Sequence, residues 1–306
     1  MLHDRREGFI HINALGKQRA VMTSIPDFDV DAFVAATLSE DLGGPPGAGG
    51  HDLTSECVIP SDAVFTGVMV SRDAIVAAGL PMAAAFFQAL DPDVKIELLV
   101  AEGEEVPPGT ELMRLRGNAR ALLTAERSAL NVVQHLTGIA TLTREYVHRI
   151  EGTGAVLLDT RKTTPGLRLL EKYATRTGGA KNYRLGLWDA VMIKDNHIAV
   201  AQSIGQAVGA VRAAGITQIS VEVDLVDQIE PAIAAGATHL LLDNMDPAVL
   251  RGAVTLVRAR VPTEASGGVT LENIRSIAET GVTYVSVGRL TQSAPAADIG
   301  LDFTIA

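Results

Sequence analysis

The sequence predicts an α/β protein in which an incomplete (β/α) barrel follows an N-terminal α/β sandwich domain. Two patterns support this prediction. From about residue 155 onward, short apolar strands alternate with helical segments, which is typical of a parallel sheet or barrel. Ahead of that point, helices and strands follow one another without this regularity. The chain has 306 residues, 47% of them hydrophobic, so it can bury a core of this size.

The N-terminal domain is predicted over residues 23–137, and we interpret residues 1–22 as an N-terminal extension. A helical pattern at residues 31–38 leads into a loop rich in glycine and proline at 43–50. Residues 80–90 are almost entirely apolar, as in a buried helix. Strand patterns occur at residues 64–70, 74–78, 95–100 and 111–115.

A long helix is expected after Asn118, because asparagine is a favoured N-cap. Apolar residues then recur three and four positions apart, which indicates one buried helix face. Gly138 is expected to break this helix before a second helical stretch at residues 139–150.

The barrel domain is predicted over residues 138–293. It has six strand–helix repeats, fewer than the eight of a complete barrel, so the barrel is predicted to be incomplete. Strands are expected at residues 155–159, 190–195, 219–224, 239–244, 263–268 and 284–288, and helices at 165–177, 200–214, 226–235, 247–260 and 271–280.

Composition narrows the classes of function. The net charge of −10 is opposite to that of a general nucleic-acid binder, so an anionic ligand needs a local basic site. The single cysteine, Cys57, excludes an intrachain disulfide and a Cys-rich metal site, which favours a cytoplasmic location. We expect Cys57 and Trp188 to be packed side chains. No apolar run reaches the length of a membrane span or a signal peptide.

Charged and polar residues follow nearly every predicted barrel strand, at the edge where barrel enzymes place their active sites. Arginine suits carboxylates and phosphates, whereas lysine acts as a mobile point charge. The cations at or near these strand ends are therefore candidates to bind a polyanion: Arg161, Lys162, Arg184 and Lys194.

Two carboxylates, Glu222 and Asp243, lie among these cations and would repel an anion directly. Their presence suggests a bridging Mg²⁺ and ribose hydroxyls. Ser266-Gly267-Gly268 and Gly288 would let backbone N–H groups approach a phosphate. Simpler roles remain open for single residues: the Ser-Gly-Gly segment could be an ordinary turn, Asp195 and Asp243 could cap helices, and His197 could be structural.

Several segments together resemble the quinolinate phosphoribosyltransferase family. The chain contains DTRKTTPGLRLLEKYATRTGG and RLGLWDAVMIKDNHI, followed by VEVD, LLLDN, EASGGV and VGRLTQS. The likeness extends from SEDLGG and HDLTS through AERSALNVVQHLTGIAT to the tail DIGLDF, in order and over most of the chain.

The resemblance implies that the C-terminal tail, residues 294–306, completes the N-terminal sandwich domain. It implies a homodimer or a higher homo-oligomer in which Arg127, in the AER motif, reaches the partner's active site. The net charge and the lack of a long apolar run, rather than the resemblance, lead us to expect no nucleic-acid or membrane partner.

The implied reaction joins quinolinate to phosphoribosyl pyrophosphate (PRPP) with Mg²⁺, giving nicotinate mononucleotide, pyrophosphate and CO₂ in de novo NAD biosynthesis. The implied catalytic residues are Glu222, Asp243, Lys162 and Lys194, with Glu222 and Asp243 holding Mg²⁺ partly through the substrate. The implied quinolinate-binding residues are Arg127, Thr160, Arg161, Lys162, Tyr183, Arg184 and Lys194. Those implied for PRPP are Lys162, Lys194, Asp195, Asn196, His197, Glu222, Asp243, Ser266, Gly267, Gly268, Val287, Gly288, Arg289 and Gln292.

The chain departs from the family's pattern at three positions. Ala180 replaces a glycine, which matters only if the position needs a positive φ. Tyr183 replaces a histidine that lines the base pocket, and it is bulkier and lacks the possible positive charge. Gln292 replaces a histidine and can still donate a hydrogen bond to phosphate.

Two alternative functions remain open at the level of sequence. The first is a paralogous phosphoribosyltransferase that acts on a different acidic heterocycle, which Tyr183 motivates. The second is a Schiff-base lyase with Lys194 as its nucleophile, because lysines at strand ends serve that chemistry.

Overall fold

The computed structural model describes residues 28–304. Within these residues the chain forms two compact units. Unit 1 contains residues 28–138 together with 296–304, and unit 2 contains residues 139–295.

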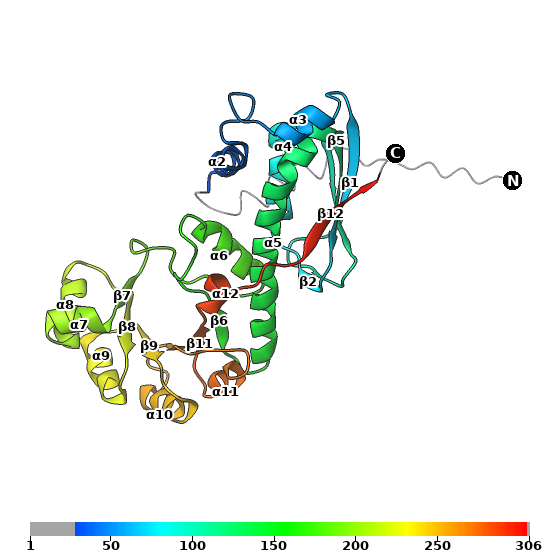
Figure 1. The fold of residues 1–306 in the computed structure, drawn as a ribbon. Coiled ribbons are helices and arrows are strands. Elements are labelled where there is room, and N and C mark those ends of the chain that lie inside the picture. The colour runs from blue at the N-terminus through cyan, green and yellow to red at the C-terminus, as the bar shows by residue number, and fades with distance from the viewer. Residues whose placement is uncertain (1–27, 305–306) are drawn as a thin grey trace. The chain divides into compact units, whose positions relative to one another are not determined.

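The sheet of unit 1 is antiparallel, with the strand order β12-β1-β5-β3. Its members are β1 (Val64–Ser71), β3 (Lys95–Leu98), β5 (Glu111–Asn118) and β12 (Ile299–Thr304). The C-terminal strand β12, red in Figure 1, pairs with β1 from the first half of the chain, with Met69 opposite Leu301. A separate two-stranded sheet joins β2 (Ile75–Val76) to β4 (Glu105–Val106).

Three helices accompany this sheet, and two of them follow from simple sequence signals. In α2 (Val30–Leu42), Asp29 caps the first turn through Ala32 N at 2.9 Å, and Gly43 ends the helix with φ +73°. The predicted helix α4 (Leu80–Leu90) is confirmed, and most of its side chains are buried. The short helix α3 (Leu53–Val58) was not predicted. Only Ser55 is buried in it, so Cys57 is exposed and the expectation of a packed thiol was wrong.

The long helix α5 (Ala119–Ile150) contributes to both units and corrects a second expectation. Asn118 Oδ1 accepts a hydrogen bond from Ala121 N at 3.2 Å, which confirms the predicted cap. Gly138, however, does not break the helix, which continues for 32 residues. A glycine costs about 1 kcal/mol relative to alanine in a helix. The burial of Leu136 and Ile139 on either side of it outweighs a cost of that size.

Unit 2 contains six parallel strands in the order β6-β11-β10-β9-β8-β7. In the described part of the chain, the edge strands β6 and β7 do not pair with each other, so the barrel stays open and the predicted fold class is confirmed. The strands are β6 (Val156–Leu158), β7 (Val191–Ile193), β8 (Ile219–Val223), β9 (His239–Asp243), β10 (Thr263–Ser266) and β11 (Tyr284–Ser286).

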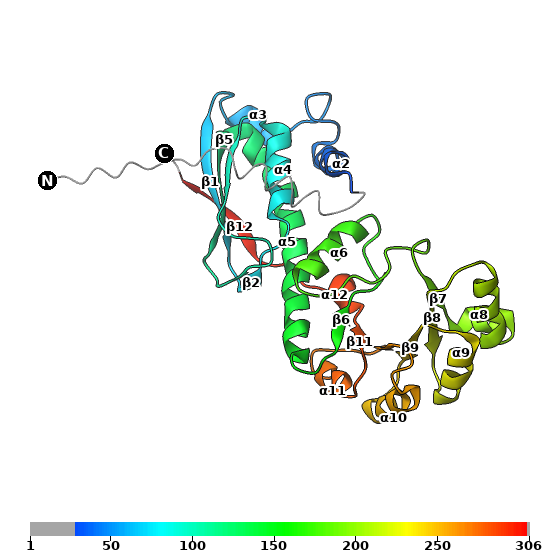
Figure 2. The same ribbon diagram turned by 180° about the vertical axis from the view of Figure 1, so that it is seen from behind.

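Helices α8 to α11 lie along one side of this sheet (Figure 2). The hydrophobic core of the unit is formed by side chains from these helices and from the strands. In β9, Leu240 and Leu242 join this core, while Leu241 and Asp243 line a pocket on the other face. The helices of unit 2 are α6 (Arg168–Thr177), α7 (Asp195–Ala201), α8 (Ile204–Ala213), the 3₁₀ turn η1 (Val226–Gln228), α9 (Ile229–Ala235), α10 (Pro247–Val257), α11 (Ile274–Ala278) and α12 (Arg289–Gln292).

One predicted helix of unit 2 is divided in two. The single helix expected at residues 200–214 is interrupted by Gln202, whose φ of +70° ends α7. Ser203 then begins α8 by accepting a hydrogen bond from Gln206 N at 3.1 Å. Serine is a favoured N-cap residue, and its side chain typically accepts a hydrogen bond from the backbone N–H three residues later. The apolar pattern continues across Ser203, so it did not indicate the start of a new helix there.

Candidate active site

Two pockets lie at the carboxyl ends of the parallel strands of unit 2. The first, the glycine pocket, has a volume of about 270 Å³, and the second, the arginine pocket, has about 400 Å³. They adjoin, because both are lined by Thr160, Lys162, Ser266 and Ser286. Since this edge is where barrel proteins place their ligands, the two pockets together are the candidate active site.

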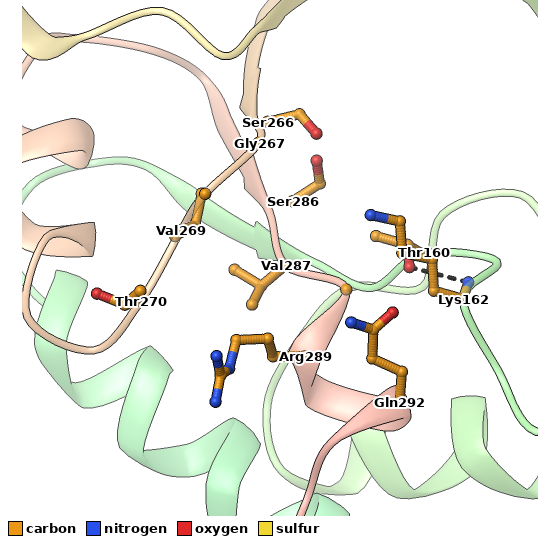
Figure 3. A pocket seen from close by; sticks show the side chains of 12 residues that line it. Thr160, Lys162, Ser266, Gly267, Val269, Thr270, Ser286, Val287, Arg289 and Gln292 are labelled. Carbon is orange, nitrogen blue, oxygen red and sulfur yellow. Dashed lines mark hydrogen bonds between the residues drawn. The ribbon is translucent and has the colours of Figure 1, made fainter.

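The glycine pocket is lined mainly by the ends of β10 and β11 and by the start of α12 (Figure 3). The side chains of Ser266 and Ser286 point toward one another, and Gln292 faces Lys162 across the pocket. The lining residues are Thr160, Lys162, Ser266, Gly267, Gly268, Val269, Thr270, Ser286, Val287, Gly288, Arg289 and Gln292.

Two glycines in this pocket lie close to neighbouring side chains, and at Gly267 the neighbour's backbone is close as well. Gly267 has φ +89°, and a Cβ there would lie 2.1 Å from Asn244 Oδ1. A Cβ on Gly288 would lie 2.7 Å from Lys162 Cδ. The loop after strand β6 is held in place from the other side, because Thr291 donates to Lys162 O at 2.6 Å and Lys162 N donates to Thr160 Oγ1 at 3.1 Å. Backbone therefore lines much of this pocket, as in phosphate sites.

The arginine pocket brings together the guanidinium groups of Arg161 and Arg184. Burial lowers the pKa of Arg184, and the charge of Arg161 lowers it further. Arg161 Nε is buried and has no hydrogen-bond partner within the described structure. A buried donor without a partner is costly, which makes Arg161 a candidate to pair with a ligand that carries acceptor atoms. The lining residues are Asp159, Thr160, Arg161, Lys162, Tyr183, Arg184, Met192, Lys194, Glu222, Leu241, Asp243, Glu264, Ser266 and Ser286.

A buried ion pair positions the segment that carries Arg184. Lys172 on α6 donates to Asp159 at 2.6 Å, and both side chains are at most 2% exposed. Burial lowers the pKa of Lys172, and the charge of Asp159 opposes that shift. Asp159 accepts from Tyr183 N at 2.8 Å and from Asn182 Nδ2 at 2.7 Å, and Lys172 donates to Tyr183 O at 2.8 Å. Sequence reasoning missed Lys172, because a lysine on an amphipathic helix is usually solvated.

The departures from the family's pattern can be located in the structure. Ala180 is buried and is not among the residues with positive φ, so the position does not need glycine. Tyr183 lines the arginine pocket, and its hydroxyl lies 2.6 Å from Ser220 Oγ. Gln292 lines the glycine pocket. Trp188, expected to be packed, is 78% exposed and covers the backbone of Gly186 instead of joining the core.

Three carboxylates form a candidate cation site beside the arginine pocket. Glu222, Asp224 and Asp243 each place one ligand atom within 4.8 Å of the others. Oxygen ligands of this kind suit Mg²⁺, so the donor set fits the predicted metal. Sequence reasoning did not assign Asp224 to the site, although its spacing of two residues from Glu222 puts both on one face. Glu222 also forms an ion pair with Lys194.

Some predicted site residues lie outside the pockets. Asp195, Asn196 and His197 are exposed in the first turn of α7, where His197 Nδ1 accepts from Lys194 N at 2.9 Å. Arg127 belongs to unit 1, at an exposed position of α5. The predicted roles of these four residues stay predictions, as do those of the residues that line the pockets. Among the described residues, no helix is long and apolar enough to cross a membrane.

The fold and the paired pockets define an α/β-barrel protein whose strand ends bring arginine, lysine and glycine residues to two adjoining pockets. The chain belongs to the quinolinate phosphoribosyltransferase family. The model of the family's C-terminal domain matches residues 139–302, and the model of its N-terminal domain matches residues 52–137.

Curated relatives agree with this membership. The chain is 43% identical over 259 residues to a probable nicotinate-nucleotide pyrophosphorylase (carboxylating) of Bacillus subtilis, covering 84% of this chain and 89% of that protein. It is 43% identical over 287 residues to the nicotinate-nucleotide pyrophosphorylase (carboxylating) of Mycobacterium leprae, covering 91% and 99%. A relative from Nicotiana glauca, 38% identical and covering 90% and 82%, is a quinolinate phosphoribosyltransferase described as mitochondrial.

Solved structures show the same fold. The nicotinate-nucleotide pyrophosphorylase of Francisella tularensis matches with a TM-score of 0.84 and 37% identity, over 92% of this chain and 99% of that one. The corresponding protein of Ehrlichia chaffeensis matches with a TM-score of 0.86 and 35% identity, over 91% and 100%.

Proposed function

We propose that this protein transfers the phosphoribosyl group of PRPP to quinolinate, with decarboxylation, in de novo NAD biosynthesis. Family membership supports the reaction. The assignment to this site depends on one observation: Arg161 and Arg184 line the same pocket, next to the glycine pocket. Arg161 Nε is in addition buried without a hydrogen-bond partner in the described structure.

The arginine pocket is the proposed site of quinolinate. A dicarboxylate supplies acceptor oxygens to both guanidinium groups and reduces their mutual repulsion. Thr160, Lys162 and Tyr183 also line this pocket and would orient the pyridine ring. Lys194, which forms an ion pair with Glu222, lines the same pocket and would contact both substrates.

The glycine pocket is the proposed site of the 5-phosphate of PRPP. Backbone N–H groups near Gly267, Gly268 and Gly288 would approach the phosphate, with Arg289 and Gln292 nearby as donors. Val287 lines the pocket as an apolar neighbour. Asp195, Asn196 and His197 are retained as proposed PRPP residues only through the family resemblance.

Glu222 and Asp243 are the proposed ligands of Mg²⁺, with Asp224 as an added candidate. The metal, when bound, neutralises the charge of the departing pyrophosphate. The two carboxylates would also offset the positive charge that develops on the ribose in an oxocarbenium-like transition state.

The bond changes need no strong base from the protein. The pyridine nitrogen forms a bond to the ribose C1 while the bond to pyrophosphate breaks. The cationic ring then accepts the electron pair left when CO₂ departs, and a proton replaces the carboxylate on that carbon. Most of the rate enhancement therefore comes from holding two anions together.

The family resemblance further supports a homodimer or a higher homo-oligomer, with Arg127 completing the partner's quinolinate site. An exposed arginine at this position of α5 is compatible with that role. A cytoplasmic location remains our proposal. The Schiff-base alternative is disfavoured, because family membership supports phosphoribosyl transfer and the Lys194 ammonium is engaged in an ion pair with Glu222.

The test is formation of nicotinate mononucleotide by purified protein given quinolinate, PRPP and Mg²⁺. Product that requires all three components supports the proposal. Absence of product, with PRPP still bound, would contradict it and direct the search to other heterocyclic acids.

A further inference from the structure

A buried carboxylate lies at the floor of the arginine pocket and is not used by the proposed mechanism. Glu264, on β10, is 1% exposed and lines the pocket together with Arg184. A carboxylate in a pocket for a dianion acts against binding, both by repulsion and by competing for the same guanidinium. The structure must therefore direct this carboxylate elsewhere.

His239 provides the alternative partner. Its Nε2 lies 2.8 Å from Glu264 Oε2, and its side chain is 13% exposed. A carboxylate oxygen accepts hydrogen bonds, so we take Nε2 of His239 as the protonated ring nitrogen, which donates this hydrogen bond to Glu264. His239 itself does not line either pocket, so it acts from beneath the floor.

Two tyrosines hold the imidazole in place. The ring centroids of His239 and Tyr183 lie 5.8 Å apart with an interplanar angle of 21°, and those of His239 and Tyr284 lie 5.7 Å apart at 13°. Lys181 Nζ lies 5.5 Å from the centroid of the Tyr284 ring. The stacked rings of Tyr183, His239 and Tyr284 thus fix the plane of the imidazole. Of these three residues, Tyr183 also lines the arginine pocket.

The electrostatic environment agrees with a competition for Arg184. Burial and the charge of Arg161 lower the pKa of Arg184, whereas the charge of Glu264 acts in the opposite direction. Both groups line the arginine pocket, so the Glu264 carboxylate belongs to the charged surroundings of this guanidinium. Without the hydrogen bond from His239, the buried Glu264 carboxylate would need another partner. The cations that line the pocket would be the partners available.

We propose that His239 is a positioning residue: it holds the Glu264 carboxylate away from Arg184, so that this arginine stays available to a carboxylate of the substrate. The inference rests on the proposed function, because it assumes that the arginine pocket takes an aromatic dicarboxylate. On this inference, His239 and Glu264 affect the affinity for the acid substrate and do not affect the binding of PRPP.

A matched pair of substitutions separates this role from simple packing. His239→Phe keeps an aromatic ring in the stack but removes the donor, whereas His239→Gln removes the ring but keeps an amide donor. We expect H239F to weaken quinolinate binding about tenfold or more, since Glu264, without its donor, would compete with the substrate for Arg184. H239Q should stay closer to wild type, and the KM for PRPP should change less than about twofold in both.

The double variant H239F/E264Q is the decisive comparison, with the dissociation constant of quinolinate measured by titration calorimetry. Removing the competing charge should restore most of the affinity lost in H239F. An unrestored double variant, or an H239F protein that binds like wild type, would overturn the inference. If H239F does not fold, E264Q alone carries the test, and weaker quinolinate binding in E264Q also overturns it.

Failure of the proposed function is visible separately. Wild-type protein that gives no nicotinate mononucleotide from quinolinate, PRPP and Mg²⁺ overturns that function and the inference together. Wild-type protein that gives product, while the His239 variants keep wild-type affinity for quinolinate, overturns the inference alone.

Discussion

The ammonium of Lys172 and the carboxylate of Asp159 form a 2.6 Å ion pair that is almost completely buried. The pair joins helix α6 to the end of strand β6 and, through Tyr183, to the segment that carries Arg184. One buried interaction thus connects the two loops that supply the arginines of the pocket. Such a pair is sensitive to the loss of either partner, because the other charge is left without compensation.

Replacing Lys172 by methionine should therefore lower the free energy of unfolding by about 3–5 kcal/mol, measured by chemical denaturation. The exposed Lys95→Met on β3 serves as the control and should change stability by less than about 0.5 kcal/mol. The double variant D159N/K172M should be less destabilised than the sum of the two single variants. Additive losses would mean that the pair is not coupled as its geometry indicates.

Arg161→Ala should reduce the affinity for quinolinate by about 2–5 kcal/mol, because it removes one partner of a desolvated charge pair. The affinity for PRPP should be largely kept, since the glycine pocket does not include Arg161. Arg251→Ala, an exposed site on α10, is the control. Near-normal quinolinate binding by R161A would show that the substrate pocket has been assigned to the wrong residues.

Glu222→Gln should leave quinolinate binding largely intact and reduce kcat on the order of 10²-fold, the effect typical of losing one transition-state electrostatic contact. Steady-state kinetics at several Mg²⁺ concentrations would measure the change and any weaker response to the metal. Glu279→Gln, which affects only an exposed ion pair with Arg275, is the control. Loss of quinolinate binding alone in E222Q would contradict the proposed metal and ribose role.

Gly267→Ala should raise the KM for PRPP about tenfold, because overpacking at a close approach costs about 1–3 kcal/mol. The new Cβ would meet Asn244 at 2.1 Å. Gly215→Ala is a matched control: it has a similar φ of +82° but open space around it, so it carries the backbone strain without the clash. Equal effects of the two substitutions on KM would remove the glycine pocket from the PRPP site.

Local signals in the sequence predicted much of the fold correctly. The six strand–helix repeats, the helix at residues 80–90 and the Asn118 cap depend on neighbours within a few positions, and periodicity reports those directly. The predicted break at Gly138 was wrong, because the intrinsic cost of one glycine is smaller than the tertiary packing around it. The division of residues 200–214 at Gln202 was missed for the opposite reason, since one residue with positive φ leaves no trace in an apolar pattern.

The candidate site likewise contains residues that local sequence signals could identify and residues that they could not. Arg161, Arg184, Glu222 and Asp243 could be predicted because parallel strands bring their carboxyl ends to one edge, whatever the details of packing. Lys172, Glu264 and His239 could not, because each acts through a partner distant in sequence.

The sequence by itself therefore determined the fold class, the family and the edge of the barrel where the chemistry resides, since these follow from periodicity and from motifs at strand ends. Only the tertiary structure decided which charges are compensated and which are free for a ligand. The reason is physical: burial and a partner's position set the cost of a charge, and both arise when β9 and β10, or β6 and α6, pack together.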